Sequence, residues 1–203
     1  MASITRGWSR VSRGGVGKRL AWGVAALCLW TGAAAAQAEE FAVRWADTRL
    51  VDGVYMLNTS IDYRFSERAL DALRSGVPLT IRLDIEVERE RSYWTDEEIA
   101  SLEQYYRLEY HALSGRYIVR NLNSGASDAY PSLDSAVSAL GLVVDFPLLD
   151  ENLIDPDQDY EVSLKASLDI ESLPSPLRPL AYLNPSWWHG SDWYSWSLKP
   201  SGA

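Results

Sequence analysis

The chain is poor in cysteine and histidine. It has one cysteine, Cys28, and two histidines, His111 and His189, in 203 residues. One cysteine cannot form an intramolecular disulfide, and the predicted removal of the segment that holds Cys28 leaves no thiol. Disulfide staples, thiol catalysis and cysteine metal sites are therefore excluded, and zinc is disfavoured. The fold must be held together by its core.

The first 38 residues lack any acidic residue but contain five basic ones, Arg6, Arg10, Arg13, Lys18 and Arg19. An apolar segment, residues 20–36, follows, and small residues stand at Ala36 and Ala38. This order is typical of a secretory signal peptide, and we predict cleavage before Glu39. Residues 1–38 are then a signal peptide, and residues 39–203 form a single β-rich periplasmic domain.

The alternative is a leader that stays uncleaved and anchors the chain in the inner membrane. The apolar segment has about 17 residues, which is the lower limit for spanning a bilayer. The alanine-rich end and the small residues at 36 and 38 favour processing instead. After cleavage we expect no stable membrane insertion.

Basic residues are scarce after the leader. Five of the 19 basic residues lie in the leader and all 28 acidic residues lie after it, so the charge changes from −9 to −14 on cleavage. No basic patch interrupts this acidic chain, so nucleic acid is not an expected partner. The remaining length of about 165 residues suits one domain.

Alternation of apolar and polar residues predicts the strands of this domain. The clearest segments are 55–65, 79–88 and 160–171, and weaker ones are 41–49, 104–112, 116–122, 142–148 and 193–198. One solvent-exposed face on each strand favours antiparallel pairing. Asp52 and Gly53 suit a tight hairpin turn between two of these strands, as do Ser114 and Gly115.

Helix signals are few. Ser66 can cap a helix that ends near residue 75, before Gly76, and Ser132 can cap a second one before Gly141. A third helix is expected to open at Thr95, because Asp96, Glu97 and Glu98 suit the positive end of a helix. Four prolines between residues 172 and 192 predict an irregular Pro/Trp-rich wrap over residues 172–203.

These patterns predict a mainly β fold, with α+β possible. We expect an antiparallel two-layer sandwich or flattened barrel of about eight strands, with two or three short helices in the connections. A single sheet backed by the helices is the alternative.

Three stretches of the sequence resemble a known family. They are residues 66–70 (SERAL), 76–79 (GVPL) and 106–117 (YRLEYHALSGRY). They resemble an exported proteobacterial family catalogued as domain of unknown function 4390, and the resemblance spans nearly the whole mature chain. It implies export and an activity that is not established. Members are often encoded beside a membrane sensor kinase of the nitrogen-regulation type, which implies an envelope partner.

No catalytic residue emerges from the sequence. His111 falls on the polar face of its strand, which is typical of a surface histidine. His189 has Ser191 and Asp192 beside it, but the members of a catalytic triad converge from separate elements.

The metal candidate is the acidic run Asp155, Asp157, Asp159 and Glu161, whose alternation is that of the start of a calcium loop. The glycine and the final glutamate of that loop are replaced by Tyr160 and Ala166. A solvated acidic connection is the favoured interpretation, and no metal or other cofactor is expected.

Aromatic residues crowd near the C-terminus, at Trp187, Trp188, Trp193, Tyr194 and Trp196. The cluster can close the core, bind a partner protein, or stack on sugar rings of a glycan. The residues chosen as candidates for ligand or partner binding are Trp187, Trp188, His189, Arg89 and Arg91. The two arginines continue the inward phase of the strand at 79–88, so either the strand leaves the core there or they meet carboxylates or an anionic ligand.

The sequence therefore favours a non-catalytic binding module that contacts an envelope partner, such as the external region of a membrane sensor kinase. The alternative is a glycan- or peptidoglycan-binding, or glycan-active, protein that uses the tryptophan cluster. A purely structural envelope factor comes third. The pattern assigns no oligomeric state.

Overall fold

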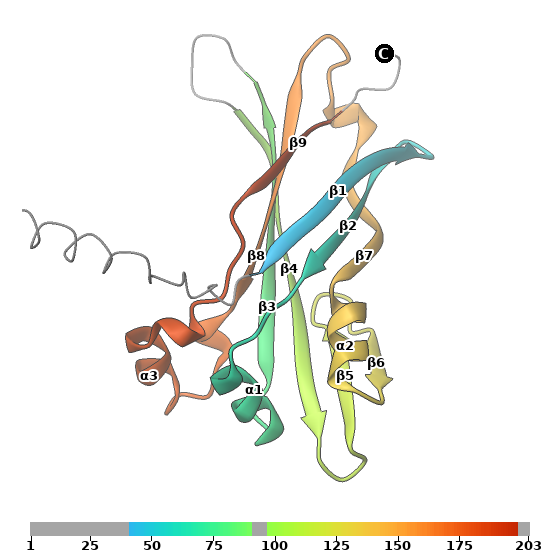
Figure 1. Ribbon diagram of the computed structural model, residues 1–203. Coiled ribbons are helices and arrows are strands. Elements are labelled where there is room, and N and C mark those ends of the chain that lie inside the picture. The colour runs from blue at the N-terminus through green and yellow to red at the C-terminus, as the bar shows by residue number, and fades with distance from the viewer. Residues whose placement is uncertain (1–40, 91–96, 199–203) are drawn as a thin grey trace, which may run out of the picture. The chain divides into compact units, whose positions relative to one another are not determined.

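Strands dominate the computed structural model, which describes residues 41–90 and 97–198 (Figure 1). Nine strands in these ranges form two antiparallel sheets. The smaller sheet has the order β1 (Ala42–Val51), β2 (Val54–Asp62), β7 (Leu142–Asp150). The larger has the order β6 (Ser127–Tyr130), β5 (Arg116–Asn121), β4 (Glu97–His111), β3 (Leu79–Arg89), β8 (Tyr160–Leu168), β9 (Tyr194–Leu198). The predicted mainly β class and the antiparallel pairing are confirmed.

The two sheets share one hydrophobic core. Alternate residues of β2, β3 and β8 are buried, as the sequence pattern predicted, and the inward side chains of both sheets belong to one packed cluster. The sheets meet directly at one edge of the sandwich, where the Trp196 indole N–H on β9 donates to Thr48 Oγ1 on β1 at 3.3 Å. They stay two separate sheets rather than closing into a barrel, so the sandwich is the arrangement observed.

The predicted turns are present. Asp52 and Gly53 have φ angles of 50° and 82°, which a two-residue hairpin with matched twist requires. Gly115 has a φ of 63° at the tip between β4 and β5. There the N–H groups of Ser114 and Gly115 both donate to the carbonyl of His111.

The two capped helices lie where the serines predict. In α1 (Glu67–Arg74) Ser66 Oγ accepts from the N–H of Ala69, and in α2 (Leu133–Leu140) Ser132 forms a capping box with Ser135. Gly76 ends the first helix with a φ of 88°. Gly141 ends the second without a positive φ, and its carbonyl accepts from the N–H of Ile61 at 2.8 Å. This bond joins the end of α2 to β2.

The expectation of a helix opening at Thr95 is wrong. Thr95 and Asp96 lie outside the described residues, but Glu97 and Glu98 begin β4, which runs unbroken to His111. They pair with Arg89 and Glu88 of β3. Pairing along the whole length of β3 outweighs the weak local preference of acidic residues for a helix start.

The third helix lies instead in the C-terminal wrap. It is α3 (Arg178–Leu183), flanked by the 3₁₀ turns η2 (Ile170–Ser172) and η3 (Pro185–Trp187), and another 3₁₀ turn, η1 (Glu151–Leu153), follows β7. Pro179 stands in the first turn of α3, where the missing backbone N–H of proline costs no helical hydrogen bond. The prolines therefore predicted an irregular segment, whereas the structure has a short helix there.

Candidate functional site

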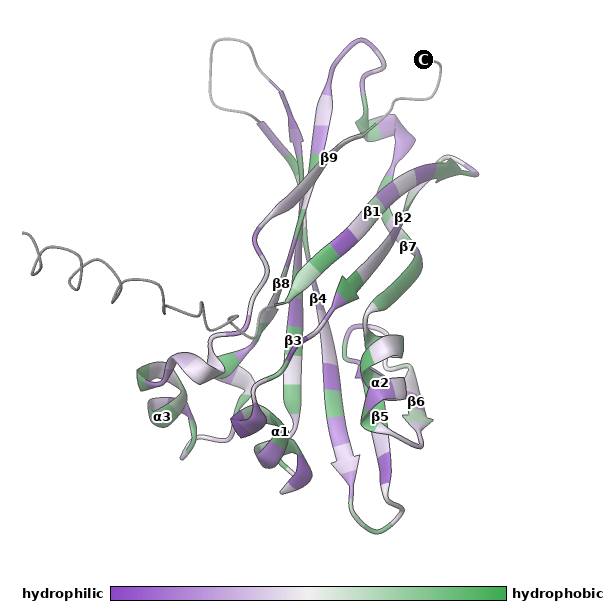
Figure 2. Cartoon of the chain, in the orientation of Figure 1, coloured by the Kyte–Doolittle hydropathy of each residue, from purple (hydrophilic) through white to green (hydrophobic). Residues whose placement is uncertain are grey.

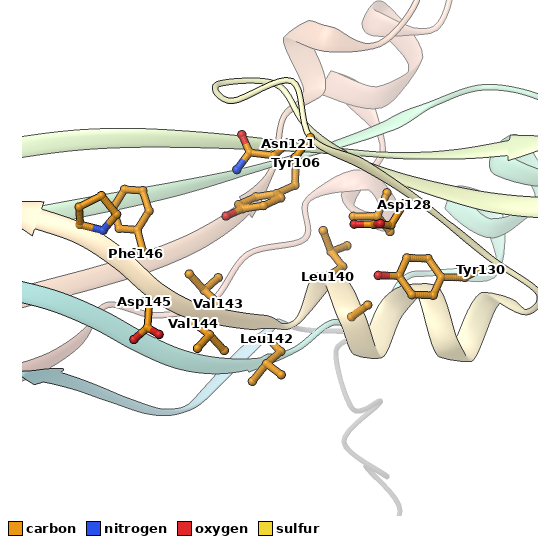
Figure 3. A pocket seen from close by; sticks show the side chains of 14 residues that line it. Tyr106, Asn121, Asp128, Tyr130, Leu140, Leu142, Val143, Val144, Asp145 and Phe146 are labelled. Carbon is orange, nitrogen blue, oxygen red and sulfur yellow. The ribbon is translucent and has the colours of Figure 1, made fainter.

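A groove opens at the edge of the sandwich where β7 and β6 are the outer strands (Figure 3). Its volume is about 450 Å³. The larger sheet supplies one wall, β7 supplies the other, and the C-terminal turn of α2 closes one end. We call this the β7 groove and define it by its principal lining residues, Tyr106, Asn121, Asp128, Tyr130, Leu140 and Phe146.

The shape of β7 keeps the groove open. Its pairing with β2 is irregular at two places, and Asp145 has a positive φ of 53°, which is rare for a residue with a side chain. Two interactions hold Asp145 in place: its N–H donates to Asn58 Oδ1 at 3.0 Å, and its carboxylate forms an ion pair with Arg49. Leu142 and Val144 are left exposed along this edge.

Tyrosines supply the polar groups of the wall formed by the larger sheet. Tyr106 is half-buried, and burial raises the pKa of its hydroxyl, an effect that a hydrogen bond with the Asn121 side chain partly offsets. Behind it, the Tyr63 hydroxyl is fully buried and has no hydrogen-bond partner in the described part of the chain. Burial first and the neighbouring Tyr106 second raise the pKa of Tyr63 far above its usual value. Both phenols therefore stay neutral near neutral pH, and Tyr106 acts as a hydrogen-bonding group rather than as a base.

Two carboxylates line the groove, and they differ in their surroundings. Asp145 is turned towards β2 and is neutralised by Arg49, whereas Asp128 lies between Tyr106 and Tyr130 (Figure 3). Asp128 forms no ion pair within residues 41–90 and 97–198. The groove thus combines apolar side chains of α2 and β7 with the phenols of Tyr106 and Tyr130 and with one carboxylate that has no ion-pair partner in the described residues.

A second hollow lies on the other side of α2, with a volume of about 470 Å³. It is lined by Tyr63 and Phe65 after β2, by Leu70 of α1, and by Leu133 and Val137 of α2. Helix α2 is therefore a wall of both hollows.

The tryptophan candidates do not form one surface. Trp187 is buried in the core, whereas Trp188 is exposed. His189 is buried again: its ring stacks on Phe41 at 5.7 Å, and its Nε2 accepts from the N–H of Ser66 at 3.3 Å. A glycan platform would therefore rest on Trp188 and on the partly exposed Trp193, beside which Lys165 lies 5.7 Å from the ring centre.

Of the two arginine candidates, the structure describes Arg89. Arg89 is the last residue of β3 and forms an ion pair with Glu97 across the hairpin, with both side chains partly exposed. The strand thus reaches solvent at this point and the arginine meets a carboxylate. Arg91 lies outside the described residues, as do the cleavage-site residues Ala36, Ala38 and Glu39.

The acidic run occupies an exposed connection and the start of β8, and His111 is the exposed last residue of β4. Asp155 Oδ1 accepts from the N–H of Asp157, and the carbonyl of Asp159 accepts from the N–H of Glu90, so the run forms a hydrogen-bonded turn. In the part of the chain that the structure describes, no three histidine, cysteine, aspartate or glutamate side chains are grouped to hold a metal ion. His111 Nδ1 lies 2.9 Å from Ser114 Oγ at the tip of the β4–β5 hairpin.

Sequence reasoning missed the β7 groove. Its residues come from β4, β5, β6, α2 and β7, and β6 was not predicted at all. The usable hint was local: the Asp145-Phe146-Pro147 run interrupts an apolar segment, which is typical of an irregular edge strand.

Comparison with known proteins defines the family but no activity. Among the described residues, no helix has the length and apolarity to cross a membrane. The chain matched no curated protein and no solved structure. Its residues 38–197 match a family described as a domain of unknown function, and the chain belongs to this DUF4390 family.

Proposed function

We propose that the protein is a non-catalytic binding module of the cell envelope, and that the β7 groove receives an apolar segment of a partner protein. The observation that carries the proposal is the groove itself, with the apolar side chains of α2 and β7, the neutral phenol of Tyr106 and the carboxylate of Asp128, which forms no ion pair in the described residues. The leader that precedes the domain supports export to the periplasm, where the partner would be met. A membrane sensor kinase with an external region is the partner class that the family resemblance suggests.

The groove suits a protein segment better than a small molecule. Its volume lies within the range of about 300–1,000 Å³ that is usual for ligand sites. Sites for small molecules, however, enclose most of the ligand, whereas this one is bordered by the exposed Leu142 and Val144. Exposed apolar side chains along a concave edge are typical of surfaces that bind other proteins.

The charges in the groove indicate which side chains the partner segment should carry. Asp145 is neutralised by Arg49, so Asp128 gives the groove its net negative charge. A segment that places a lysine or arginine beside Asp128 and apolar side chains along β7 would satisfy both features.

The arrangement of the carboxylates argues against hydrolysis in the groove. A glycosidase needs two carboxyl groups facing each other across the scissile bond. Here the Asp145 carboxylate is turned away from Asp128 and held by Arg49 (Figure 3).

Site-specific photocrosslinking in intact cells tests the proposal. The photoreactive residue replaces Val144 in the groove, which is 58% exposed, or Leu153 in η1, which is 57% exposed and serves as the matched control. We expect one discrete adduct with an envelope protein from position 144 and none from position 153. The crosslinked segment of the partner should be apolar and should contain a basic residue.

Removal of the Asp128 charge gives a second test of the proposal. Asp128→Asn should lower the yield of the adduct about two- to fivefold, since an exposed ion pair contributes up to about 1 kcal/mol. Asp157→Asn changes the net charge equally on an exposed turn and should leave the yield unchanged. Equal yields from positions 144 and 153, together with pelleting on purified peptidoglycan that Trp188→Ala abolishes, would favour the glycan alternative.

A further inference from the structure

Exposed apolar side chains gather on the short helix α3 and the residue that follows η3. Leu180 is 61% exposed, Leu183 is 84% exposed and Trp188 is 61% exposed, and Tyr182 on the same helix is also exposed. The Trp188 indole N–H donates to the carbonyl of Ala181 at 3.2 Å, which fixes the ring against α3. Figure 2 shows the hydrophobic residues of this helix. We call Leu180, Tyr182, Leu183 and Trp188 the α3 patch.

The segment that carries the α3 patch is poor in acidic residues, and the nearest carboxylate, that of Glu171, accepts from the Tyr182 hydroxyl at 3.3 Å. Between Glu171 and Asp192 the sequence has no acidic residue, although the chain holds 28 of them, and Arg178 is the one formally charged side chain in that interval. An acidic protein is repelled by an anionic membrane surface, but this segment carries none of that charge. Leucine, tryptophan and tyrosine are also the residues that favour the interface of a bilayer.

The α3 patch also lies close in space to Phe41, the first residue that the structure describes after the predicted leader. Phe41 is buried against His189 and Tyr63, with ring centres 5.7 Å and 4.8 Å away, and His189 directly follows Trp188. Ala36, the last residue of the apolar segment, is five residues before Phe41, a distance of at most about 18 Å for an extended chain. A chain whose leader is still in the membrane would therefore keep Phe41 close to the bilayer surface.

We propose that the α3 patch docks on the lipid surface of the membrane, with Leu180, Leu183 and Trp188 entering the interface between headgroups and acyl chains. Binding is peripheral and depends on apolar contact rather than on charge. The inference rests on export of the chain but not on the β7 groove, so the two can fail separately.

Labelling at single positions tests the docking directly. Residues 39–203 form a compact unit with its own core and contain no cysteine, so Leu183→Cys or Leu113→Cys gives one site for a polarity-sensitive dye. Leu113 is the matched control, since it is 96% exposed at the tip of the β4–β5 hairpin. On addition of phosphatidylcholine vesicles, the dye at 183 should shift to the blue and the dye at 113 should not.

Vesicle flotation supplies the quantitative arm. Leu180→Ser with Leu183→Ser should lower the fraction that floats with the vesicles by about tenfold or more, because two apolar side chains no longer enter the interface. Leu113→Ser should float as the unsubstituted protein does. Addition of phosphatidylglycerol and high salt should change binding little, since apolar contact is not screened.

Three results would overturn the proposal: no blue shift at position 183, an equal shift at position 113, or binding confined to anionic vesicles and lost at high salt. Capture of a protein by a crosslinker at position 183, without vesicle binding, would assign the α3 patch to a protein contact instead.

Discussion

The two long edges of the sandwich are built differently. At one edge β1 and β9 approach closely and are joined by the bond between Trp196 and Thr48. At the other edge the chain passes from β6 to β7 through helix α2. A helix with its side chains is about 10 Å wide or more, twice the spacing of about 4.8 Å between paired strands. β6 and β7 belong to different sheets, α2 packs against both of them, and the β7 groove lies between the two sheets at this edge. The difference teaches that the irregular shape of β7 and the packing of α2 beside it together leave this edge open.

The largest effect should come from the attachment of α2 at the open edge. A Cβ atom on residue 141 would lie 2.2 Å from the backbone oxygen of Ile61, although the backbone angles of Gly141 suit any residue. Gly141→Ala should therefore lower the free energy of unfolding by about 3 kcal/mol, as overpacking against backbone does. Urea unfolding measures this effect.

Gly190→Ala is the control for this substitution. Its Cβ would lie 3.5 Å from the nearest atom, the oxygen of Ala166, which is an ordinary contact. This variant should unfold within about 0.5 kcal/mol of the unsubstituted protein. Equal losses in the two variants would contradict the importance of the α2 attachment.

Alkaline pH should act next, through Tyr63 beneath the open edge. Its pKa is raised in the folded state, mainly by burial, so above about pH 10 the unfolded chain loses this proton while the folded chain keeps it. Stability is then present below pH 10 and falls as pH rises, by up to about 1.4 kcal/mol per pH unit for this group. Urea unfolding at pH 9, 10 and 11 should show the fall, and Tyr63→Phe should reduce it. An unchanged slope in that variant would mean that other groups cause the loss.

At the closed edge a smaller effect is expected. Trp196→Phe removes the indole N–H that donates to Thr48 Oγ1, and should cost about 1 kcal/mol of unfolding free energy. Thr48→Val removes the other partner. If the bond joins the sheets, the losses in the double variant will be less than additive by about 0.5 kcal/mol or more. Strict additivity would show that the bond does not couple β1 to β9.

The smallest effect has the opposite sign. The Tyr63 hydroxyl is buried without a partner in the described residues, and a buried polar group without a hydrogen bond is unfavourable. Tyr63→Phe should therefore raise stability at neutral pH by about 0.5–1 kcal/mol. Tyr55→Phe, which changes another buried tyrosine of the same face, is the comparison. Loss of stability in the Tyr63 variant would show that its hydroxyl is bonded in solution.

Most of the fold could be predicted because its signals are local. Leu83, Ile85 and Val87 alternate with charged residues so regularly that β3 could be read directly, and Ser66 and Ser132 marked two helix starts through their own side chains. Glu97 and Glu98 were misread because pairing with Arg89 and Glu88 of β3 sets their strand, and a helix-start pattern reports only the few positions beside it.

The candidate site could not be predicted for the same reason. Tyr106, Asp128 and Phe146 come from three strands, and only the order of strands in the two sheets brings them together. The two adjacent tryptophan candidates show that neighbouring residues of the same type can differ in exposure. Trp187 and Trp188 look equivalent in sequence, yet the packing of η3 against α1 buries one and leaves the other exposed.

The sequence by itself determined the strand class, the acidic and thiol-free character of the domain and the positions of its capped helices, because these depend on residue type and on spacing within a few positions. The tertiary structure alone decided which edge of the sandwich stays open, which carboxylate in the groove is paired with an arginine and which tryptophan reaches solvent. Each of these depends on contacts between residues far apart in the chain, such as Arg49 with Asp145 and Ile61 with Gly141.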